Sequence, residues 1–336
     1  MALDVKVKID LAKPVGKAGL GIPLILEEMA TAGEIAYKEC RNLADVIAAG
    51  FAATTKVYKA ANTIFMQENA PDKIAVCKTN LGTSLWLDDV ANTGKDWRQL
   101  IVVTESETPV AVSDIMTKIE TLDNKMYFAD LDVGDSTALT VSNINRTVLF
   151  YCKATEDYPS PVAALVGATA GLDAGSFVYK NMILAGIAPQ NLSDTEIDAI
   201  HKKGGITFVT KAGDNVVTEG KTAGGEYIDI IDSKDFVISN LEYQTQKTLN
   251  TMAKIPYDNN GIAILESVAV NVMRDAYNNG IIATNEDGTA AYTVSYAKRE
   301  NVAEADKAAR KYIGGQFAFV LAGAIHTVEI TGEVII

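Results

Sequence analysis

Alternating apolar and polar residues predict a β-strand with one buried face near each end of the chain. Neither strand has a neighbouring run in the sequence that would pair with it. A chain whose final residues, Ile335 and Ile336, are apolar suggests an end that is held against another surface. The apolar positions of the two strands are Val5, Val7, Ile9, Leu11, Val328, Ile330, Val334 and Ile336. We expect both strands to pair with another molecule, and a second copy of this chain is one candidate.

Proline and glycine residues separate both terminal strands from the rest of the chain. Pro14, Gly16 and Gly19 follow the first strand, and Gly314 and Gly315 precede the last extended stretch. These residue types interrupt regular structure and favour turns or flexible connections. The first strand is therefore expected to be an arm, and these five residues are the predicted hinges of the two arms.

Strands alternate with helices over the first two thirds of the chain. Strands are predicted at 21–26, 73–79, 100–104, 126–131 and 147–153, and helices at 43–51, 56–68, 109–122 and 136–141. Pro109 is expected in the first turn of its helix, where proline is favoured. The nearly continuous apolar run at 146–152 is typical of a buried central strand. This alternation predicts an α/β layered arrangement.

Two local motifs follow this region. Ser193 and Glu196 have the spacing of a capping box at the beginning of a helix over 193–203. Strands at 206–211 and 215–219 are separated by a short glycine-containing segment, which predicts a β-hairpin.

A glycine-rich change in composition at 221–225 precedes a different pattern. The remaining predicted elements are helices at 233–254, 261–278 and 301–312, a strand at 291–296 and an extended stretch at 316–336. The first two helices are long, and each carries one apolar stripe. Asn259 or Asn260 is the expected N-cap of the second helix.

Composition and charge narrow the classes of protein to consider. The 336 residues are 48% hydrophobic and 22% charged, which is typical of a folded protein with about two domains. The net charge of −13 argues against non-specific binding to nucleic acid. The first residues lack a signal-peptide pattern, and no run is apolar enough to span a membrane. We expect a soluble protein that is made in the cytosol and does not insert into membranes.

No residues form a recognisable catalytic, cofactor or metal site in the sequence. Cys40, Cys77 and Cys152 are odd in number and widely spaced, so reduced, packed thiols are expected. His201 is expected at an exposed helix end, and His326 is expected to be a hydrogen-bonded strand residue. The glycine pairs lack the spacing of a dinucleotide or Walker motif, so no cofactor is expected.

A cluster of acidic residues after Gly225 has two explanations. Asp229, Asp232 and Asp235 are carboxylates, but their spacing is not that of a calcium loop. Either Asp232 or Ser233 is instead expected to cap the following helix, with acidic residues near its positive end. The capping explanation is preferred over a metal site.

Three basic residues are spaced to share one face of the predicted helix at 301–312. They are Lys307, Arg310 and Lys311. They form either a solvated face with cations near the end of a helix or a contact with an acidic partner surface.

Several short segments resemble the C-terminal half of contractile-tail sheath proteins. They lie at 224–229, 255–262, 278–282, 305–310 and 321–326. The early segments at 21–26 and 58–61, with Phe65, resemble the same family. The resemblance covers both ends of the chain and is poor over about 81–220. The order of the segments is more specific than any single motif.

The resemblance implies the tail sheath of a phage or of a phage-tail-like particle. In that family, an inner domain surrounds a tail tube, arms add strands to sheets of neighbouring subunits, and a variable domain faces outward. The implied partners are further copies of the chain in a helix or stacked rings, the tail tube protein, and baseplate and tail terminator proteins. The implied location is the virion tail, where contraction serves genome ejection. The family has no catalytic residues to transfer.

Together, the patterns and the resemblance predict a mixed α/β (α+β) fold. It consists of a layered α/β outer region, a helix-rich inner domain and extended N- and C-terminal strand arms. The predicted divisions are an N-terminal arm at 1–13, an α/β region at 14–224 with a variable outer part at about 81–220, an inner domain at 225–326 and a C-terminal arm at 327–336. Lys307, Arg310 and Lys311 are then candidates for contact with the tube.

Contraction would be a rigid-body rearrangement of subunits that remain tethered by their arms. It would drive the tube through the target envelope without a nucleotide. Two alternatives remain open from the sequence: an α/β enzyme of unknown activity, or another self-assembling structural protein such as a tube or surface-layer subunit.

Overall fold

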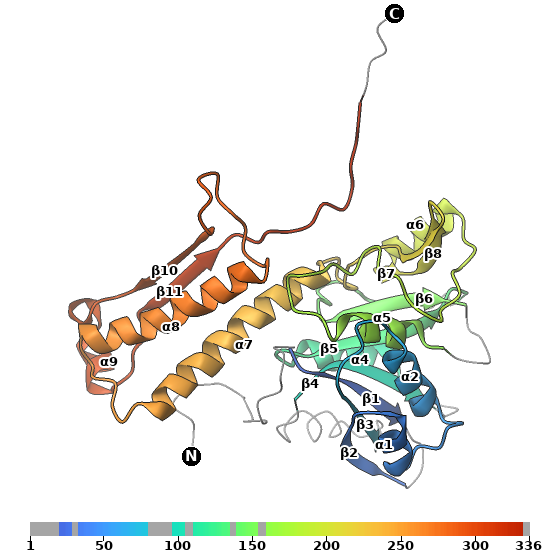
Figure 1. The fold of residues 1–336 in the computed structure, drawn as a ribbon, viewed down its shortest axis with the longest axis horizontal. Helices are drawn as coiled ribbons and strands as arrows, with labels where there is room; N and C mark the ends of the chain where they lie inside the picture. Colours follow the sequence, from blue (N-terminus) through green and yellow to red (C-terminus); the bar gives the residue numbers. More distant parts are fainter. Residues whose placement is uncertain are drawn as a thin grey trace, which may run out of the picture.

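The computed structural model of the chain describes residues 20–28, 33–79, 96–104, 110–134, 139–153 and 159–331. These residues form an α/β body and a C-terminal module of two long helices and a two-stranded hairpin (Figure 1). Several predicted arm and hinge positions lie outside the described residues, namely Val5, Val7, Ile9, Leu11, Pro14, Gly16, Gly19, Val334 and Ile336.

A seven-stranded sheet forms the centre of the α/β body, in the order β2-β3-β1-β4-β5-β6-β7. Its strands are β1 Ile22–Glu28, β2 Ile35–Cys40, β3 Ile74–Thr79, β4 Trp97–Thr104, β5 Met126–Asp132, β6 Thr147–Cys152 and β7 Gly205–Ile206. Only β2 runs antiparallel to its neighbour; the other pairs are parallel. Parallel strands are buried on both faces, which explains their continuous apolar runs.

Helices cover both faces of the sheet. They are α1 Leu43–Ala48, α2 Lys56–Phe65, α4 Val112–Glu120, α5 Pro161–Thr169 and α6 Asp194–Lys202. Ile25 of β1 packs with α1, α2 and α5, whereas Leu24 and Leu26 pack with α4 and α6 on the other face. The side chains of β1 therefore alternate between two cores.

Helix α5 was not predicted, because it is apolar on all sides and has no helical period. All nine of its residues are buried. Gly167 allows α5 to approach α2 closely, since a Cβ there would come within 2.6 Å of the Ile64 carbonyl oxygen. A helix enclosed by a sheet and a second helix needs no polar face.

The local motifs of the body are confirmed with one correction. Ser193 Oγ accepts a hydrogen bond from the Glu196 N–H, and Glu196 Oε2 accepts one from the Ser193 N–H, so the capping box is present. The hairpin forms from β8 Phe208–Lys211 and β9 Asp214–Val217. Helix α4 begins at Val112, so Pro109, which lies outside the described residues, does not start it.

A helix was also predicted at 136–141. Residues 139–141 are not helical, and residues 136–138 lie outside the described part of the chain. The three cysteines are free, and Cys40 and Cys77 are buried, as expected of packed thiols.

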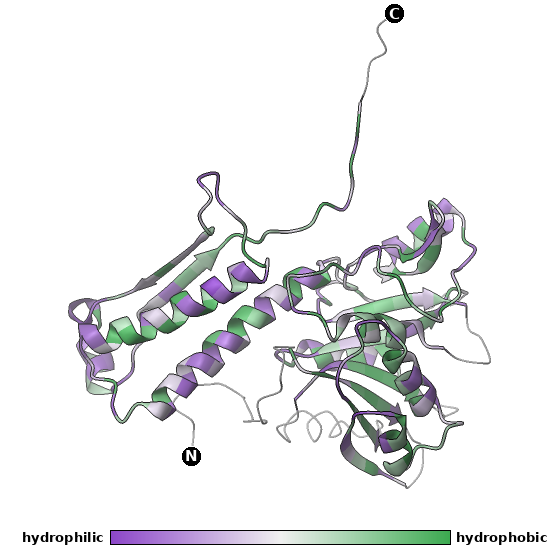
Figure 2. Cartoon of the chain, in the orientation of Figure 1, coloured by the Kyte–Doolittle hydropathy of each residue, from purple (hydrophilic) through white to green (hydrophobic). Residues whose placement is uncertain are grey.

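The C-terminal module is formed by the last third of the chain. Its elements are α7 Ile228–Thr251, α8 Asn259–Asn278, β10 Tyr292–Tyr296, η1 Arg299–Asn301, α9 Glu304–Ala308 and β11 Gly315–Phe319. Helices α7 and α8 lie side by side, and the β10–β11 hairpin packs along α8 (Figure 1). Figure 2 shows mainly hydrophobic strands in the body but a mixture of hydrophilic and hydrophobic residues along α7 and α8.

The beginnings of α7 and α8 correct the predicted N-caps of both helices. Helix α7 begins at Ile228 after Tyr227, so neither Asp232 nor Ser233 is its cap. The N-cap of α8 is Asp258, whose side chain accepts a hydrogen bond from the Gly261 N–H, and not Asn259 or Asn260. Asp258 was missed because its neighbours Asn259 and Asn260 have a similar capping propensity, whereas α7 begins after Tyr227, which makes no side-chain capping hydrogen bond and gives no signal of a helix start.

Helix α9 is much shorter than the predicted helix at 301–312. It ends at Ala308, and Arg310 has a positive φ of 55°, which no continuing helix permits. The Lys311 N–H donates to the Asp306 carbonyl oxygen at the turn that follows. Lys307, Arg310 and Lys311 therefore do not share a helix face.

Candidate assembly surfaces and the junction of the two parts

The β10–β11 hairpin has one unpaired edge on each strand. Its strands pair antiparallel, with Tyr292 opposite Phe319 and Val294 opposite Phe317. Within the described residues, this sheet contains these two strands alone. The unpaired N–H and C=O groups of a strand edge are a template for pairing with another chain. The hairpin therefore offers two edges for an added strand.

The two faces of the hairpin differ in polarity. Tyr292, Val294 and Phe319 pack against the core of the module, and Phe317 lies on the same face. Phe317 is still 45% exposed, and its ring stacks on that of Phe319 at 6.4 Å. A strand added beside β11 would bury this exposed ring with its own apolar residues.

The C-terminal segment, defined here as residues 322–331, is extended and belongs to no sheet within the described chain. It passes the end of α7, and its outer part then projects away from the molecule (Figure 1). Val328 is 70% exposed and Ile330 is 89% exposed. The two described pairing positions of the predicted C-terminal arm are thus open to solvent in the isolated subunit.

Gly314 and Gly315 have a packing role in the hairpin that differs from the predicted hinge. A Cβ at Gly314 would lie 2.7 Å from Ala297 Cβ, and one at Gly315 would lie 2.8 Å from the Tyr296 ring. Gly314 precedes β11 and Gly315 is its first residue, whereas the free segment begins after the strand. Gly323 lies in that segment with φ of +60°, and a Cβ there would meet nothing within 4 Å.

The basic residues of the module lie in separate environments. Lys307 Nζ is 2.9 Å from Glu304 Oε1, in an ion pair within α9. Arg310 and Lys311 are exposed beyond the end of that helix. The Tyr257 hydroxyl donates to the Lys311 carbonyl oxygen and ties this turn to the loop before α8.

A buried ionic network joins α7 to the sheet of the body. Arg98, on β4, is fully buried, and it donates to Asp232 Oδ1 at 2.5 Å and Asp235 Oδ2 at 2.7 Å. Arg146 makes a bidentate pair with Asp235 at 2.9 and 3.0 Å. The Tyr179 hydroxyl donates to Asp232 Oδ2 at 2.8 Å. Two arginines and two aspartates thus balance each other's charge, and of the four only Arg146 is partly exposed.

The network shifts the pKa values of Asp235 and Arg98 in favour of their charged forms. Burial alone would raise the pKa of Asp235, but the hydrogen bonds and charges of Arg146 and Arg98 hold it below its ordinary value. Burial likewise opposes the charge of Arg98, and Asp232 and Asp235 raise its pKa above the ordinary value. Because an unpaired buried charge is costly, these contacts hold the first turns of α7 against the sheet.

The sequence contained one signal for this network that was missed. Arg98 and Gln99 are buried polar residues beside the apolar run at 100–103, and a charge in a buried strand requires a partner. Asp232 and Asp235 are those partners and occupy the interior of α7, instead of the predicted helix cap. Asp232 and Asp235 lie far from Arg98 along the chain, so no local sequence pattern indicated these ion pairs.

The two histidines also differ from their predictions. His201 is half-buried and not exposed; its Nε2 lies 2.9 Å from Thr218 Oγ1, and burial lowers its pKa. His326 lies in the extended C-terminal segment and not in a strand. Its Nδ1 is 3.4 Å from Glu219 Oε1, and its ring meets the Tyr227 ring edge-on.

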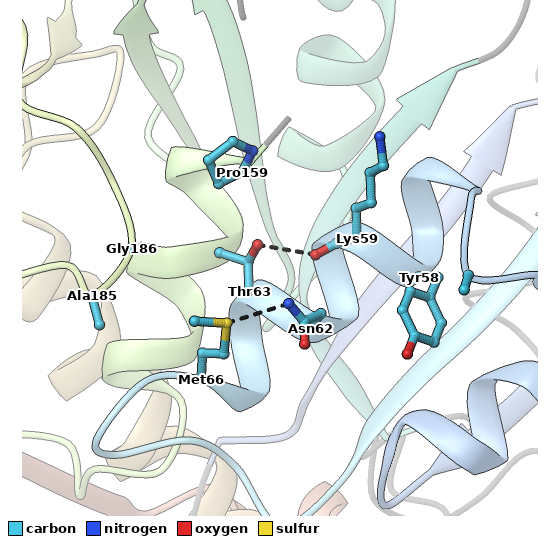
Figure 3. A pocket seen from close by; sticks show the side chains of 9 residues that line it. Tyr58, Lys59, Asn62, Thr63, Met66, Pro159, Ala185 and Gly186 are labelled. Carbon is cyan, nitrogen blue, oxygen red and sulfur yellow. Dashed lines mark hydrogen bonds between the residues drawn. The ribbon is translucent and has the colours of Figure 1, made fainter. Parts of the chain in front are cut away.

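A surface hollow of about 370 Å³ lies between α2 and the segment around Gly186 (Figure 3). Asn62 Nδ2 donates to Met66 Sδ at 3.3 Å, and Thr63 donates to the Lys59 carbonyl oxygen at 3.0 Å. None of the side chains that line it is a carboxylate, histidine or thiol. Its titratable side chains are those of Tyr58 and Lys59.

The described residues contain neither a candidate metal site nor a candidate membrane-spanning helix. Among them, no three His, Cys, Asp or Glu side chains are grouped to hold a metal ion. No helix in the described part of the chain is both long enough and apolar enough to cross a membrane.

A family model matches the C-terminal module. Residues 228–334 match the model described as the E217 tail sheath protein gp31-like C-terminal domain. The match begins at the first residue of α7 and includes the whole hairpin. No curated protein matches the amino-acid sequence of the chain.

Solved structures from contractile injection systems have the same fold over nearly the whole chain. A chain of the anti-feeding prophage baseplate matches with a TM-score of 0.74 and 14% identity, covering 99% of this chain and 98% of that one. A chain of the contracted anti-feeding prophage helical sheath matches with a TM-score of 0.72 and 14% identity, covering 98% of each chain.

A third match extends the comparison to another particle. A chain of the contracted sheath complex of PVC, an extracellular contractile injection system, has a TM-score of 0.69 and 15% identity. The match covers 99% of this chain and 98% of that one. Residues 228–334 thus match a model of tail sheath C-terminal domains, and the chain as a whole has the fold of the chains in these two contracted sheath structures.

Proposed function

We propose that the chain is the structural subunit of a contractile sheath. It polymerises around a tail tube, and its contraction drives the tube through a target envelope. One observation carries the proposal: a chain with the sheath fold has an open two-stranded hairpin and an exposed, unpaired apolar segment in the same subunit.

The proposed bond between subunits is strand addition. Val5, Val7, Ile9 and Leu11 of the N-terminal arm, and Val328, Ile330, Val334 and Ile336 of the C-terminal arm, are the pairing positions. An added strand satisfies its backbone groups on the hairpin edge and buries alternate side chains against the module. At about 1 kcal/mol net per backbone hydrogen bond, each arm contributes several kcal/mol before its ordering cost.

These contacts build an extended assembly. An arm of one subunit meets a hairpin of the next, so the two surfaces in contact are different and the contact need not close on itself. Repetition of such a contact gives a helix or stacked rings. Baseplate and tail terminator proteins are the proposed partners at its ends, and the assembly belongs to a virion tail or a phage-tail-like particle.

Contraction is proposed to move subunits as rigid bodies. The buried network of Arg98, Arg146, Asp232 and Asp235 supports this, because it holds the long helix α7 against the sheet. Flexibility is assigned to the arms, at Pro14, Gly16 and Gly19 of one and in the segment around Gly323 of the other. No nucleotide is required, since the energy comes from better contacts in the contracted packing.

Arm substitutions test the proposed function. Replacing Val328 and Ile330 by serine removes two apolar pairing positions, whereas Thr327→Ser with Glu329→Gln changes the opposite face of the same segment. We expect the first variant to remain a folded monomer by circular dichroism but to form few sheaths in negative-stain electron microscopy. The second should assemble as the wild type does.

A deletion extends the test to the other arm. Removing residues 1–11 is expected to leave a folded subunit that no longer forms sheaths. If either the deletion variant or the double serine variant forms wild-type-like tubular assemblies, the arm changed in that variant does not act by strand addition.

Contact with the tube is assigned to the basic residues of the module. Reversing the charges of Lys307, Arg310 and Lys311 to glutamate should reduce co-sedimentation with tube protein several-fold. Lys298→Glu, at another exposed position of the same module, is the matched control. Unchanged co-sedimentation of the triple variant would remove these residues from the tube contact.

A further inference from the structure

The C-terminal segment crosses from the module to the body before it becomes free. Leu321 bridges to Ile282, and the Ala322 N–H donates to the Ile281 carbonyl oxygen at 2.9 Å. Both of these contacts are within the module. The next contacts, made by His326, are with the body. Residues 323–325 therefore form a strap between two attachment points.

His326 is the one residue of this stretch whose side chain is largely enclosed. Its side chain is 13% exposed, although the preceding Ile325 is 87% exposed. Nδ1 lies 3.4 Å from Glu219 Oε1, and the imidazole ring meets the Tyr227 ring at 4.7 Å and 69°. A single docked side chain between exposed neighbours marks a specific attachment.

Glu219 and Tyr227, the two residues that His326 contacts, make further contacts of their own. Glu219 follows β9 and is paired with Lys180 Nζ at 3.6 Å, while its Oε1 accepts from the Gly220 N–H at 3.2 Å. Lys221 Nζ lies 4.8 Å from the centre of the Tyr227 ring. An ionised carboxylate only accepts hydrogen bonds, so Nδ1 of His326 is the protonated nitrogen in this contact.

The strap spans a second hollow. A volume of about 270 Å³ lies at the junction, lined on the body side by Gly175 and Ser176, on the module side by Asp229 and Gly280, and by Gly323 of the strap. The strap is therefore not packed against a core along its length. Gly323, whose surroundings are open, is placed to let it change direction.

We propose that His326 is a positioning residue that docks the base of the C-terminal arm on the α/β body, and so sets the reach and direction of the arm toward a neighbouring subunit. The proposal rests on the sheath function proposed above. With His326 docked, the free arm begins at Thr327; with His326 released, it begins at Gly323 and gains four residues.

Release of His326 from the body lengthens the free arm. Four extended residues span at most about 14 Å, so the same arm has a short and a long reach. A subunit that stays connected to its neighbour while the two rearrange requires such a difference in reach. The docking contact is one hydrogen bond and one ring contact, so it can break without unfolding either part.

The direct test measures the position of the arm in the monomeric subunit. Spin labels at Ile330→Cys and at the exposed Asn215→Cys of β9, in a Cys152→Ser background, report the distance between arm and body. We expect a narrow distance distribution with His326 present, and at least a twofold broader one in His326→Ala. Thr327→Ala, at the adjacent exposed residue, should keep the narrow distribution.

Two further variants separate docking from a general effect on folding. Glu219→Gln retains an acceptor for the Nδ1–H and should stay close to wild type, whereas Glu219→Ala should broaden the distribution as His326→Ala does. A broad distribution in the wild type, or an unchanged one in His326→Ala, would overturn the proposal.

Assembly provides the second readout. If the sheath function holds, His326→Ala should lower the fraction of regular sheaths in electron micrographs several-fold while Thr327→Ala does not. If neither the wild type nor any variant assembles, the sheath function fails, but the distance measurement on monomers still decides whether His326 docks. Regular assembly of His326→Ala at the wild-type level would refute its positioning role.

Discussion

The α/β body and the C-terminal module use their apolar residues differently. In the body, whole strands such as β1 and the whole helix α5 are buried. In the module, buried residues of α7 end at Val237, although the helix continues to Thr251. Complete burial thus extends through whole elements of the described body, whereas the part of α7 beyond Val237 is half-buried or exposed within the subunit. The difference teaches that the sheet and its helices enclose their apolar residues within the subunit, and that the outer half of α7 does not.

Exposed large apolar side chains follow the same division. In the module they are Ile238, Leu249, Met252, Ile313, Phe317 and Val320, and in the C-terminal segment Ile325, Val328 and Ile330. Among the described residues of the body they are Ile47, Met66 and Ile183. An apolar stripe on a helix predicts burial, but that burial need not occur within one subunit.

The largest predicted effect is at the junction between the two parts. Asp235→Ala would leave Arg98 and Arg146 buried without a shared partner, and should lower the free energy of unfolding by about 3–5 kcal/mol. Urea denaturation followed by circular dichroism measures this change. Glu304→Ala, which removes the exposed partner of Lys307, should leave the midpoint unchanged. Equal midpoints for Asp235→Ala and wild type would show that the junction does not depend on the network.

A matched pair of leucines compares the two cores directly. Leu149→Ala in β6 removes a fully buried side chain and should cost about 2–5 kcal/mol. Leu241→Ala in α7 removes a half-buried one and should cost about 1 kcal/mol in the isolated subunit. Thermal unfolding of both monomers gives the comparison. If Leu241→Ala lowered the free energy of unfolding as much as Leu149→Ala does, the predicted difference between the two cores would be wrong.

Acid should weaken the junction between the module and the body. The folded pKa of Asp235 lies below its ordinary value, so the unfolded state takes up the proton first as pH falls. The stabilisation is therefore present above about pH 4 and is lost as pH falls through the folded pKa. Denaturant midpoints between pH 5 and pH 2 should fall less steeply in Asp235→Asn than in wild type. Asp214→Asn, in the β8–β9 hairpin, should follow the wild-type slope, and a common slope for all three would exclude a role for Asp235.

The smallest predicted effect concerns the beginning of α8. Asp258→Ala removes the side chain that accepts from the Gly261 N–H and should cost about 1 kcal/mol. Asn260→Ala, two residues later, should change the unfolding free energy by less than half of that. Denaturation of the two variants decides between the observed cap and the predicted one, and a larger cost for Asn260→Ala would favour the latter.

The strands of the body could be predicted because their burial is complete. A strand covered on both faces has an apolar run that is visible without knowledge of its neighbours, as in β3 and β6. Strand β2 was missed because it is a half-exposed edge strand with a mixed pattern. Helix α5 was missed for the opposite reason, since complete burial removed its period.

The candidate assembly surfaces could be predicted only in part. The alternation at Val328 and Ile330 indicated a strand with an apolar face, and the structure leaves both residues exposed. The placement of Lys307, Arg310 and Lys311 on one helix face was wrong, because α9 ends after Ala308. Residue spacing describes a face only where the helix continues, and tertiary contacts decide where it ends.

The sequence alone determined the local elements: the buried strands, the capping box at Ser193, the hairpin of β8 and β9, and the apolar alternation of the last segment. Only the tertiary structure decided which residues meet, because contacts between distant parts of a chain leave no local pattern. Arg98 meets Asp232 and Asp235 across 134 and 137 residues, and His326 meets Glu219 across 107. Each of these contacts joins the C-terminal part of the chain to the α/β body, and none is visible as a spacing in the sequence.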